Sequence, residues 1–350
     1  MHRAIWLELD ESGQFYRDLR ELGSEQIRQQ LPAGDVTVRV EFSTLNYKDA
    51  LALTHHGPVV RQWPMVPGID AAGVIEESDV SAWPIGTRVV INGCGLGENF
   101  WGGLAQRVRV KSDWLTAVPA NLSNWDAMCL GTAGYTAMLA CMCLRDQGVK
   151  PEHGELLVTG ATGGVGSLSV WILAQWGYPV VALTGKTEHE AFLKQLGAQR
   201  VMARTDLSQA GKPLQKEHWA GAVDSLGSQT LANICAQTRR RGVVAACGLA
   251  QGSDLPLTVM PFILRGVRLI GIDSVMCPVE QRQKAWDLLA DLKPSDMLET
   301  LGQTIGLDEC FSAAEQLIRA EVRGRFVVDV NRWHGESMQL GRRIHSHASG

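Results

Sequence analysis

The residues with the clearest chemical meaning form a glycine-rich turn, GATGGVG at 160–166, with its glycines spaced G-x-x-G-x-x-G. Residues 156–158 before it are apolar, as in a buried parallel strand, and residues 167–176 after it predict a helix. Backbone without side chains lets a pyrophosphate approach closely, and a helix N-terminus adds free N–H groups and a positive dipole end. The order strand, glycine turn, helix therefore predicts a dinucleotide site. Its expected phosphate-binding residues are Thr162, Gly163, Gly164 and Val165.

The end of the next strand indicates which dinucleotide binds. The apolar run 180–183 ends in Thr184, Gly185 and Lys186, and Arg204 follows the next short strand. An NAD site usually places an Asp or Glu here to bind the ribose 2′-hydroxyl, whereas a 2′-phosphate needs donors and positive charge. We therefore predict NADPH as the cofactor. The alternative is that Lys186 and Arg204 are ordinary solvated charges.

Composition limits the class of protein. The chain has 350 residues, 45% of them hydrophobic and 20% charged, with a net charge of −4. Its length suggests two domains, and its charge gives no reason to expect nucleic acid or an anionic membrane as partner. We expect no apolar run as long as a membrane span and no secretory signal, and so a cytoplasmic protein. The eight cysteines are scattered, which favours buried reduced thiols over disulfides or a four-cysteine zinc lobe.

The pattern of elements divides the chain. Residues 1–124 contain short β-strands separated by glycines and prolines, and residues of about 300–330 are expected to complete this domain. Residues 125–299 alternate strand and helix, which predicts an α/β domain with a doubly wound parallel sheet. Residues 331–350 are polar and are expected to be a disordered tail. The apolar strand at 267–272 comes last in the inferred sheet order, and an unpaired apolar edge predicts a homodimer.

Several longer motifs resemble one known family. They are LNYKDAL at 45–51, PMVPGIDAAG at 64–73, GENFWGGLAQ at 97–106, GTAGYTAM at 131–138, VTGATGGVG at 158–166, VAACGLA at 244–250 and VMPFILRGVRLIGIDSV at 259–275. The chain resembles the medium-chain dehydrogenase/reductase superfamily, in its NADPH-dependent acrylyl-CoA reductase (quinone oxidoreductase-like) branch. The resemblance implies a GroES-like catalytic domain joined to a Rossmann domain. It also implies reduction of the carbon–carbon double bond of an acyl-CoA substrate, acrylyl-CoA, to propionyl-CoA.

Zinc enzymes of that superfamily have metal ligands that this chain lacks. Asn46 stands where they carry their first zinc cysteine, and Ile69 stands at the histidine of their Gly-His-Glu. Only Cys129 is at a third ligand position. One thiol with an amide and an aliphatic side chain does not make a zinc site, so we expect no metal and a buried thiol at Cys129.

The resemblance also implies site residues. Tyr47, with Asn46, is the expected catalytic group, and Tyr47 also contacts the cofactor; the alternative is a core tyrosine that closes the cleft. Asp49 either orders the cleft or caps a helix that begins at Ala50. Arg61 is a candidate for contact with a CoA phosphate. The nicotinamide end of the cofactor is expected to contact Leu249, Ile263 and Ser274.

Three functions are compatible with the sequence. The first is acrylyl-CoA reductase, in which hydride passes to the β-carbon and a proton to the α-carbon without a metal. The second is an NADPH:quinone or general enone reductase, whose cofactor-binding half would look identical. The third is a structural or sensing protein that binds NADPH without turnover; the intact N-Y-K-D at 46–49 argues against it.

Overall fold

The chain forms two compact units. The computed structural model describes residues 1–31, 33–292 and 294–333. Unit 1 contains Met1–Thr132, Val275–Trp286 and the described residues from 294 onward, and unit 2 contains Ala133–Ser274 and Asp287–Leu292. The probable tail, 331–350, lies mostly outside the described residues.

Unit 1 is built on a mixed sheet with strand order β14-β15-β3-β4-β5-β7, and β6 also pairs with β3. A separate antiparallel hairpin joins β1 to β2. The strands are β1 (His2–Leu9), β2 (Phe15–Leu22), β3 (Val36–Leu45), β4 (Asp70–Ser78), β5 (Arg88–Asn92), β6 (Arg107–Val110), β7 (Thr116–Ala117), β14 (Gly302–Gly306) and β15 (Arg325–Asp329). The helices are α1 (Ser24–Gln30), α2 (Tyr47–Thr54), α8 (Val279–Asp291), α9 (Ser295–Leu301) and α10 (Cys310–Ile318), with a short 3₁₀ turn, η1 (Ser112–Trp114). The last residues of α8 belong to unit 2.

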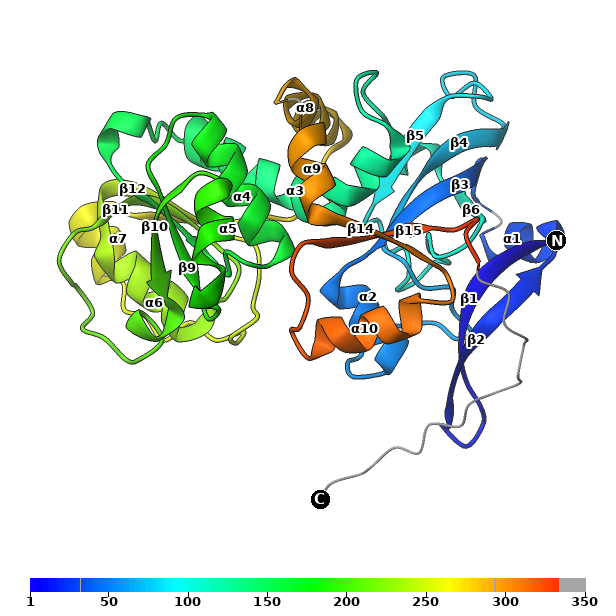
Figure 1. The fold of residues 1–350 in the computed structure, drawn as a ribbon, viewed down its shortest axis with the longest axis horizontal. Coiled ribbons are helices and arrows are strands. Elements are labelled where there is room, and N and C mark those ends of the chain that lie inside the picture. The colour runs from blue at the N-terminus through cyan, green and yellow to red at the C-terminus, as the bar shows by residue number, and fades with distance from the viewer. Residues whose placement is uncertain (32, 293, 334–350) are drawn as a thin grey trace. The chain divides into compact units, whose positions relative to one another are not determined.

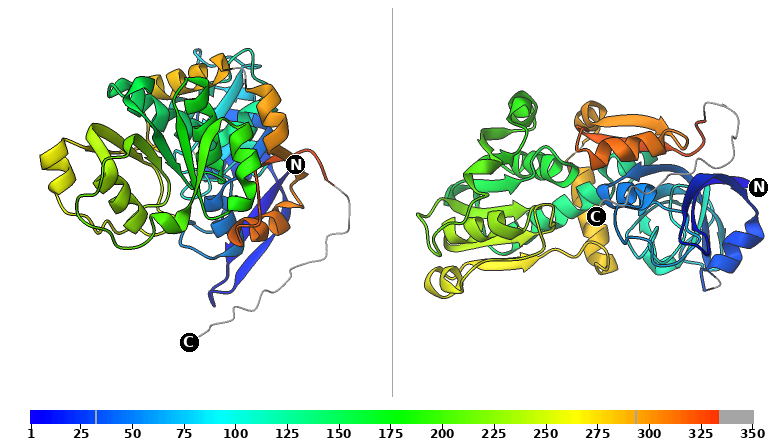
Figure 2. Two further views of the ribbon diagram at one scale, coloured as in Figure 1. Left: turned by 60° about the vertical axis from the view of Figure 1, so that its left-hand side comes forward. Right: turned by 90° about the horizontal axis from the view of Figure 1, so that it is seen from below.

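Strands far apart in the sequence meet in this sheet. β15 runs antiparallel to β3, with Phe326 opposite Leu45, and β14 runs parallel to β15 (Figures 1 and 2). Residues 302–329 therefore complete the sheet that residues 36–92 begin.

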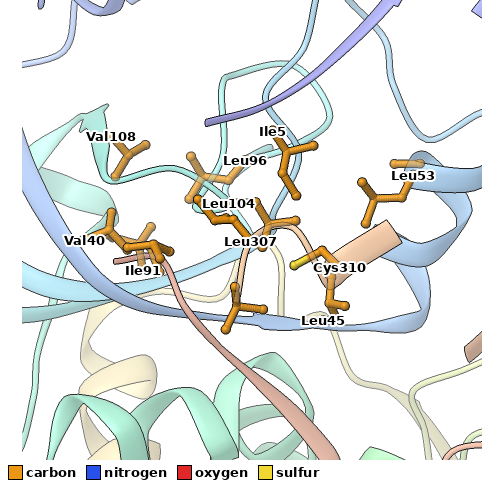
Figure 3. Close-up of a cluster of buried hydrophobic side chains, with 14 of the residues drawn as sticks. Ile5, Val40, Leu45, Leu53, Ile91, Leu96, Leu104, Val108, Leu307 and Cys310 are labelled. Carbon is orange, nitrogen blue, oxygen red and sulfur yellow. The ribbon is translucent and has the colours of Figure 1, made fainter. Parts of the chain in front are cut away.

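The core of unit 1 follows from the alternation of its strands. Val36, Val38 and Val40 on β3 are buried, whereas Arg39 between them is exposed. Figure 3 shows part of this core, in which side chains from the strands meet those of α2 and α10. The labelled members are Ile5, Val40, Leu45, Leu53, Ile91, Leu96, Leu104, Val108, Leu307 and Cys310.

Unit 2 is a doubly wound parallel sheet, which confirms the predicted fold class. The strand order is β10-β9-β8-β11-β12-β13, and all neighbouring strands are parallel. The strands are β8 (Leu156–Thr159), β9 (Val180–Thr184), β10 (Ala198–Ala203), β11 (Trp219–Asp224), β12 (Thr238–Ala246) and β13 (Arg268–Gly271). The helices are α4 (Gly164–Gln175), α5 (Glu190–Gln195), α6 (Ser228–Gln237) and α7 (Met260–Arg265), with 3₁₀ turns η2 (Pro151–His153), η3 (Thr187–His189) and η4 (Arg204–Asp206). Helix α4 packs on β8 to β11, and α6 and α7 pack on β12 (Figure 1).

One helix corrects an expectation from the sequence. Helix α3 (Asn124–Asp146) is broken at Gly131, whose φ and ψ are 51° and −159°. Among the described residues, α3 is the one helix that is long and apolar enough to cross a membrane, whereas we expected no apolar run of that length. However, 89% of its most apolar window is buried inside the protein, as in a core helix.

Candidate functional site

The glycine turn of unit 2 has the shape of a phosphate cradle. The chain leaves β8 at Gly160, whose φ is +56°, and enters the twelve-residue helix α4 at Gly164. A Cβ atom on Gly166 would collide with the carbonyl oxygen of Gly160, so only glycine fits there. The first N–H groups of α4 have no acceptor within the helix and are available to an anion. The turn therefore fits the pyrophosphate of a dinucleotide.

The residues predicted to read the 2′-phosphate lie together. The hydroxyl oxygens of Thr162 and Thr184 are 3.0 Å apart, and the backbone N–H of Lys186 donates to the Thr184 hydroxyl. The guanidinium carbon of Arg204 is 3.4 Å from the position that a Cβ on Gly185 would occupy. The Arg204 guanidinium therefore lies beside the end of β9, and Lys186 follows that end directly in the chain. This arrangement of hydroxyl groups and positive charge, without an acidic residue among them, fits a 2′-phosphate.

A second set of polar residues, which the sequence analysis missed, ties the turn to β11. The Thr159 hydroxyl donates to the carboxylate of Asp224, and the Ser225 hydroxyl donates to the Thr159 carbonyl. Ser225 also lies close to Gly160, because a Cβ there would be 2.5 Å from the Ser225 hydroxyl oxygen. Burial raises the pKa of Asp224. These residues hold the carboxyl ends of β8 and β11 together at the point where the sheet order reverses.

The three residues expected at the nicotinamide end differ in placement. Leu249 lies beside the carboxyl end of β11, since its Cα is 3.4 Å from where a Cβ on Gly227 would lie, and its side chain is 66% exposed. Ser274 follows β13 at the same edge of the sheet. Ile263 is 72% exposed on α7, which packs on β12 and α6. No contact described here joins Ile263 to the turn, and its role stays a prediction.

In unit 1, the N-terminus of α2 is held by a capping box. Asn46, not Asp49, is the N-cap residue and the helix begins at Tyr47, so the alternative in which Asp49 caps a helix that begins at Ala50 is wrong. The Asp49 carboxylate accepts hydrogen bonds from the Asn46 backbone N–H at 2.8 Å and from the Ile69 backbone N–H at 2.9 Å. Asp49 thereby satisfies one backbone donor at the start of α2 and one in the segment before β4.

Asp70 is the centre of a buried polar network. Its carboxylate accepts from the Asn46 side chain at 2.8 Å, from Asn92 at 2.6 Å, and from the N–H and hydroxyl of Thr132 at 2.9 and 2.6 Å. Asn92 in turn accepts from the indole N–H of Trp286.

Arg325 closes this network and was not predicted. Its Nη2 donates to the side-chain oxygens of Thr44 and Asn46, both at 3.0 Å, and its Nε donates to the Cys129 carbonyl. Gly131 makes room for it, because a Cβ there would be 3.0 Å from Nη2. An arginine inside the apolar strand RFVVD was the available signal, since a charged residue at a buried strand position needs a partner.

Burial controls the charges of this network. The pKa of Asp49 is raised to about 6, first by burial and then by the nearby charge of Asp70. Burial also lowers the pKa of Arg325, against the attraction of both carboxylates. One guanidinium therefore stands among two carboxyl groups, an arrangement that fixes the side chains of Asn46 and Asp49 in place.

Tyr47 is the first residue of α2, and 58% of it is exposed. It is therefore not a core tyrosine, which was the alternative we considered. Its neighbour Lys48 forms an ion pair with Glu98 at 2.9 Å and is held at the surface. Asn46 lies immediately before it and belongs to the buried network, so the position of the Tyr47 backbone is firmly fixed.

Comparison with known proteins agrees with this geometry. Residues 164–291 match the family model described as zinc-binding dehydrogenase, and residues 32–120 match that of the alcohol dehydrogenase GroES-like domain. A probable acrylyl-CoA reductase AcuI from Escherichia coli (strain K12) is 51% identical over 302 residues, 86% of this chain and 93% of that protein. The acrylyl-CoA reductase AcuI of Ruegeria pomeroyi is 45% identical, over 95% of this chain and all of that protein. The yhdH oxidoreductase from Salmonella enterica, solved in complex with NADP, superposes with a TM-score of 0.90 at 47% identity, covering 94% of this chain and 99% of that one.

The chain belongs to the acrylyl-CoA reductase branch of the medium-chain dehydrogenase/reductase superfamily. The resemblance described above places Asn46, Ile69 and Cys129 at the positions at which zinc members of the superfamily are expected to bind metal. Here the Asn46 amide is engaged by Asp70 and Arg325, and the Ile69 N–H by Asp49. The Cys129 thiol is 3.7 Å from the Leu298 carbonyl, and burial raises its pKa to about 12.

Proposed function

We propose that this chain reduces the carbon–carbon double bond of acrylyl-CoA to give propionyl-CoA, with NADPH as reductant. The observation that carries the proposal is its membership in the acrylyl-CoA reductase branch over nearly the whole chain. The paired cations Lys186 and Arg204 beside the glycine turn support NADPH as the cofactor.

Unit 2 holds the cofactor in this proposal. The turn at 160–166 and the N-terminus of α4 bind the pyrophosphate, and Thr184, Gly185, Lys186 and Arg204 bind the 2′-phosphate. When bound, NADPH supplies a hydride, which adds to the β-carbon of the thioester. Leu249 and Ser274, at the carboxyl edge of the sheet, contact the nicotinamide end.

Tyr47 and Asn46 carry the chemistry that the chain itself provides. Hydride addition moves the electron pair of the double bond toward the thioester oxygen and leaves an enolate. The Tyr47 hydroxyl donates a hydrogen bond to that oxygen and stabilises its charge. Asn46 is a positioning residue: through the capping box and its contacts to Asp70 and Arg325, it sets where α2 presents Tyr47. The α-carbon takes a proton from water, which completes the reduction.

A steady-state comparison tests this function. We would measure NADPH oxidation with acrylyl-CoA, crotonyl-CoA and a benzoquinone, and identify the acyl product by mass spectrometry. We expect kcat/KM to be highest for acrylyl-CoA and the product to be propionyl-CoA. A higher kcat/KM for the benzoquinone would replace our proposal with a quinone reductase, and NADPH binding without turnover of any of the three would indicate a non-catalytic protein.

We also propose a homodimer. β13 is at the edge of its sheet, and only one of its sides is paired within the described chain. The neighbouring helix α7 exposes Ile263 and Leu264, and Val259 before it is exposed as well. An unpaired edge beside exposed apolar side chains favours pairing with a second copy. Light scattering at micromolar concentration should give twice the mass of one chain, and a monomer would contradict the proposal.

We place the enzyme in the cytoplasm. All eight cysteines lie in the described part of the chain, and each has a free thiol. Thiols that remain unpaired are typical of a reducing compartment.

A further inference from the structure

A groove on unit 1 has no part in the chemistry described so far. It encloses about 380 Å³ and is lined by aromatic rings, an exposed proline, a methionine and side-chain amides, without a charged side chain. The lining residues are Trp6, Gln26, Gln29, Gln30, Gln62, Trp63, Pro64, Met65 and Trp101.

The tryptophans of this groove are held rigidly. Trp6 and Trp101 meet edge to face, with ring centroids 5.2 Å apart. The indole N–H of Trp101 donates to the Pro64 carbonyl, and that of Trp6 donates to Glu8. Since these N–H groups are used within the protein, the rings offer the groove mainly their carbon surfaces.

The combination of flat aromatic surfaces and amide groups suits a heterocyclic base. A heterocyclic base can stack on an aromatic ring, and the polar edge of the base can form hydrogen bonds with side-chain amides. The amides of Gln26, Gln29 and Gln62 are exposed along the groove. The Gln26 oxygen accepts from the Gly23 N–H and the Gln29 NH₂ group donates to Glu25, so the Gln26 NH₂ group, the Gln29 oxygen and the Gln62 amide face such an edge as donors and acceptors.

The groove is connected to Tyr47 through α2. Trp63 packs against His55, the residue that ends this helix, with ring centroids 5.9 Å apart. A helix of eight residues is about 12 Å long. The extended pantetheine arm of CoA with its diphosphate is longer than that, so a thioester at Tyr47 and a base beside Trp63 can belong to one molecule.

A positively charged residue that is close to the groove in the chain supports a nucleotide as the ligand. Arg61 directly precedes Gln62 and Trp63, and its side chain is exposed. Its backbone N–H donates to the carbonyl of Glu98, which fixes the start of the segment. Arg61 is two residues from Trp63 in the chain, so its guanidinium can contact a phosphate while the ring of Trp63 stacks on a base.

We propose that this groove binds the adenine of the CoA substrate, stacked on Trp63, with Arg61 at the CoA phosphates. The inference rests on the proposed function, because it assigns the nucleotide end of the same acyl-CoA.

The test compares acrylyl-CoA with acrylyl-pantetheine, which lacks the nucleotide. We would determine kcat/KM for both thioesters in the wild type, in Trp63→Ala and in Arg61→Ala. The wild type should prefer acrylyl-CoA, and each substitution should reduce that preference by about tenfold or more. Trp83→Ala is the matched control, since Trp83 is also partly buried against the same core but does not line the groove. It should retain the wild-type preference.

The outcomes separate this inference from the proposed function. Wild-type enzyme that reduces neither thioester would refute the function itself. Enzyme that reduces both with a preference unchanged in Trp63→Ala and Arg61→Ala would overturn the groove assignment alone. Thermal unfolding of each variant checks folding, and if Trp63→Ala does not fold, the exposed Arg61→Ala variant decides the result. Its effect should shrink in high salt, as expected for a phosphate contact.

Discussion

At the scale of single residues, the account depends first on the hydroxyl of Tyr47. Its ring is exposed at the first position of α2, while the residue before it is locked into a buried network. A Tyr47→Phe substitution therefore keeps the aromatic ring and removes only the hydroxyl donor, without disturbing the core.

We expect Tyr47→Phe to lower kcat for acrylyl-CoA roughly 10- to 1,000-fold, because one well-placed donor to the enolate oxygen is lost. The dissociation constant for NADPH should be measured on the same variant. Tyr16→Phe, which removes a surface hydroxyl bonded to Asp10, is the control. An unchanged kcat would end the catalytic role of Tyr47, and weaker NADPH binding alone would make it a cofactor-binding residue.

The choice between NADPH and NADH also depends on single residues. Lys186→Ala should raise the KM for NADPH roughly 10- to 100-fold and leave the KM for NADH nearly constant, since only NADPH carries the 2′-phosphate. Lys194→Ala removes a surface cation that pairs with Glu190 and serves as control. Equal changes for both cofactors would show that Lys186 does not bind the phosphate.

The sequence predicted those site residues whose neighbours in space are also their neighbours in the chain. The glycine turn and Thr184-Gly185-Lys186 follow their strands directly, so their grouping could be predicted. Arg325 could not, because its partners Thr44 and Asn46 are about 280 positions away and meet it only through the pairing of β15 with β3. Asn92 was missed because it lies opposite Asp70 only once β4 pairs with β5.

At the scale of elements, α2 is set by chemistry at its first turn. Asp49 accepts backbone N–H groups from both Asn46 and Ile69, and so joins α2 to the segment before β4. Of the two roles considered for Asp49, that of an N-cap is wrong, because Asn46 takes that position. The strands β2 and β14 were also missed; in β2, four of the eight residues are charged, which hides the strand pattern.

Asp49 predicts a pH dependence of stability. Its folded-state pKa is raised from 3.8 to about 6, so between these values the folded state holds a proton that the unfolded state has lost. Its contribution to the free energy of unfolding is therefore largest below the unfolded pKa, and falls by at most about 1.4 kcal/mol per pH unit as pH rises through this window. Denaturant unfolding of wild type and Asp49→Asn across the window should show this slope only in the wild type. Parallel curves would contradict it.

At the scale of the whole molecule, the fold is that of a superfamily that includes zinc enzymes. The network around Asp70 holds Asn46, which the resemblance places at a zinc-ligand position, in hydrogen bonds to protein partners. The parallel sheet followed from the alternation of strand and helix after residue 124. The pairing of β14 and β15 with β3 depends on contacts across the whole chain, which no local pattern records.

Purified enzyme should contain less than stoichiometric zinc and keep its activity in a chelator, because Asn46 and Cys129 are engaged with protein partners. Elemental analysis together with assays in chelator checks this expectation. One zinc per chain with inactivation on its removal would show that the network rearranges to bind metal.

The central claim is that hydride from NADPH reaches the β-carbon of acrylyl-CoA and that water supplies the second hydrogen. The most direct test uses NADPH carrying deuterium at the transferred position of nicotinamide C4, with mass spectrometry and NMR of the product. We predict propionyl-CoA with one deuterium on its methyl carbon, and in deuterated water with unlabelled NADPH, one deuterium on the α-carbon. Label from NADPH at the α-carbon, or NADPH oxidation without propionyl-CoA, would contradict the account.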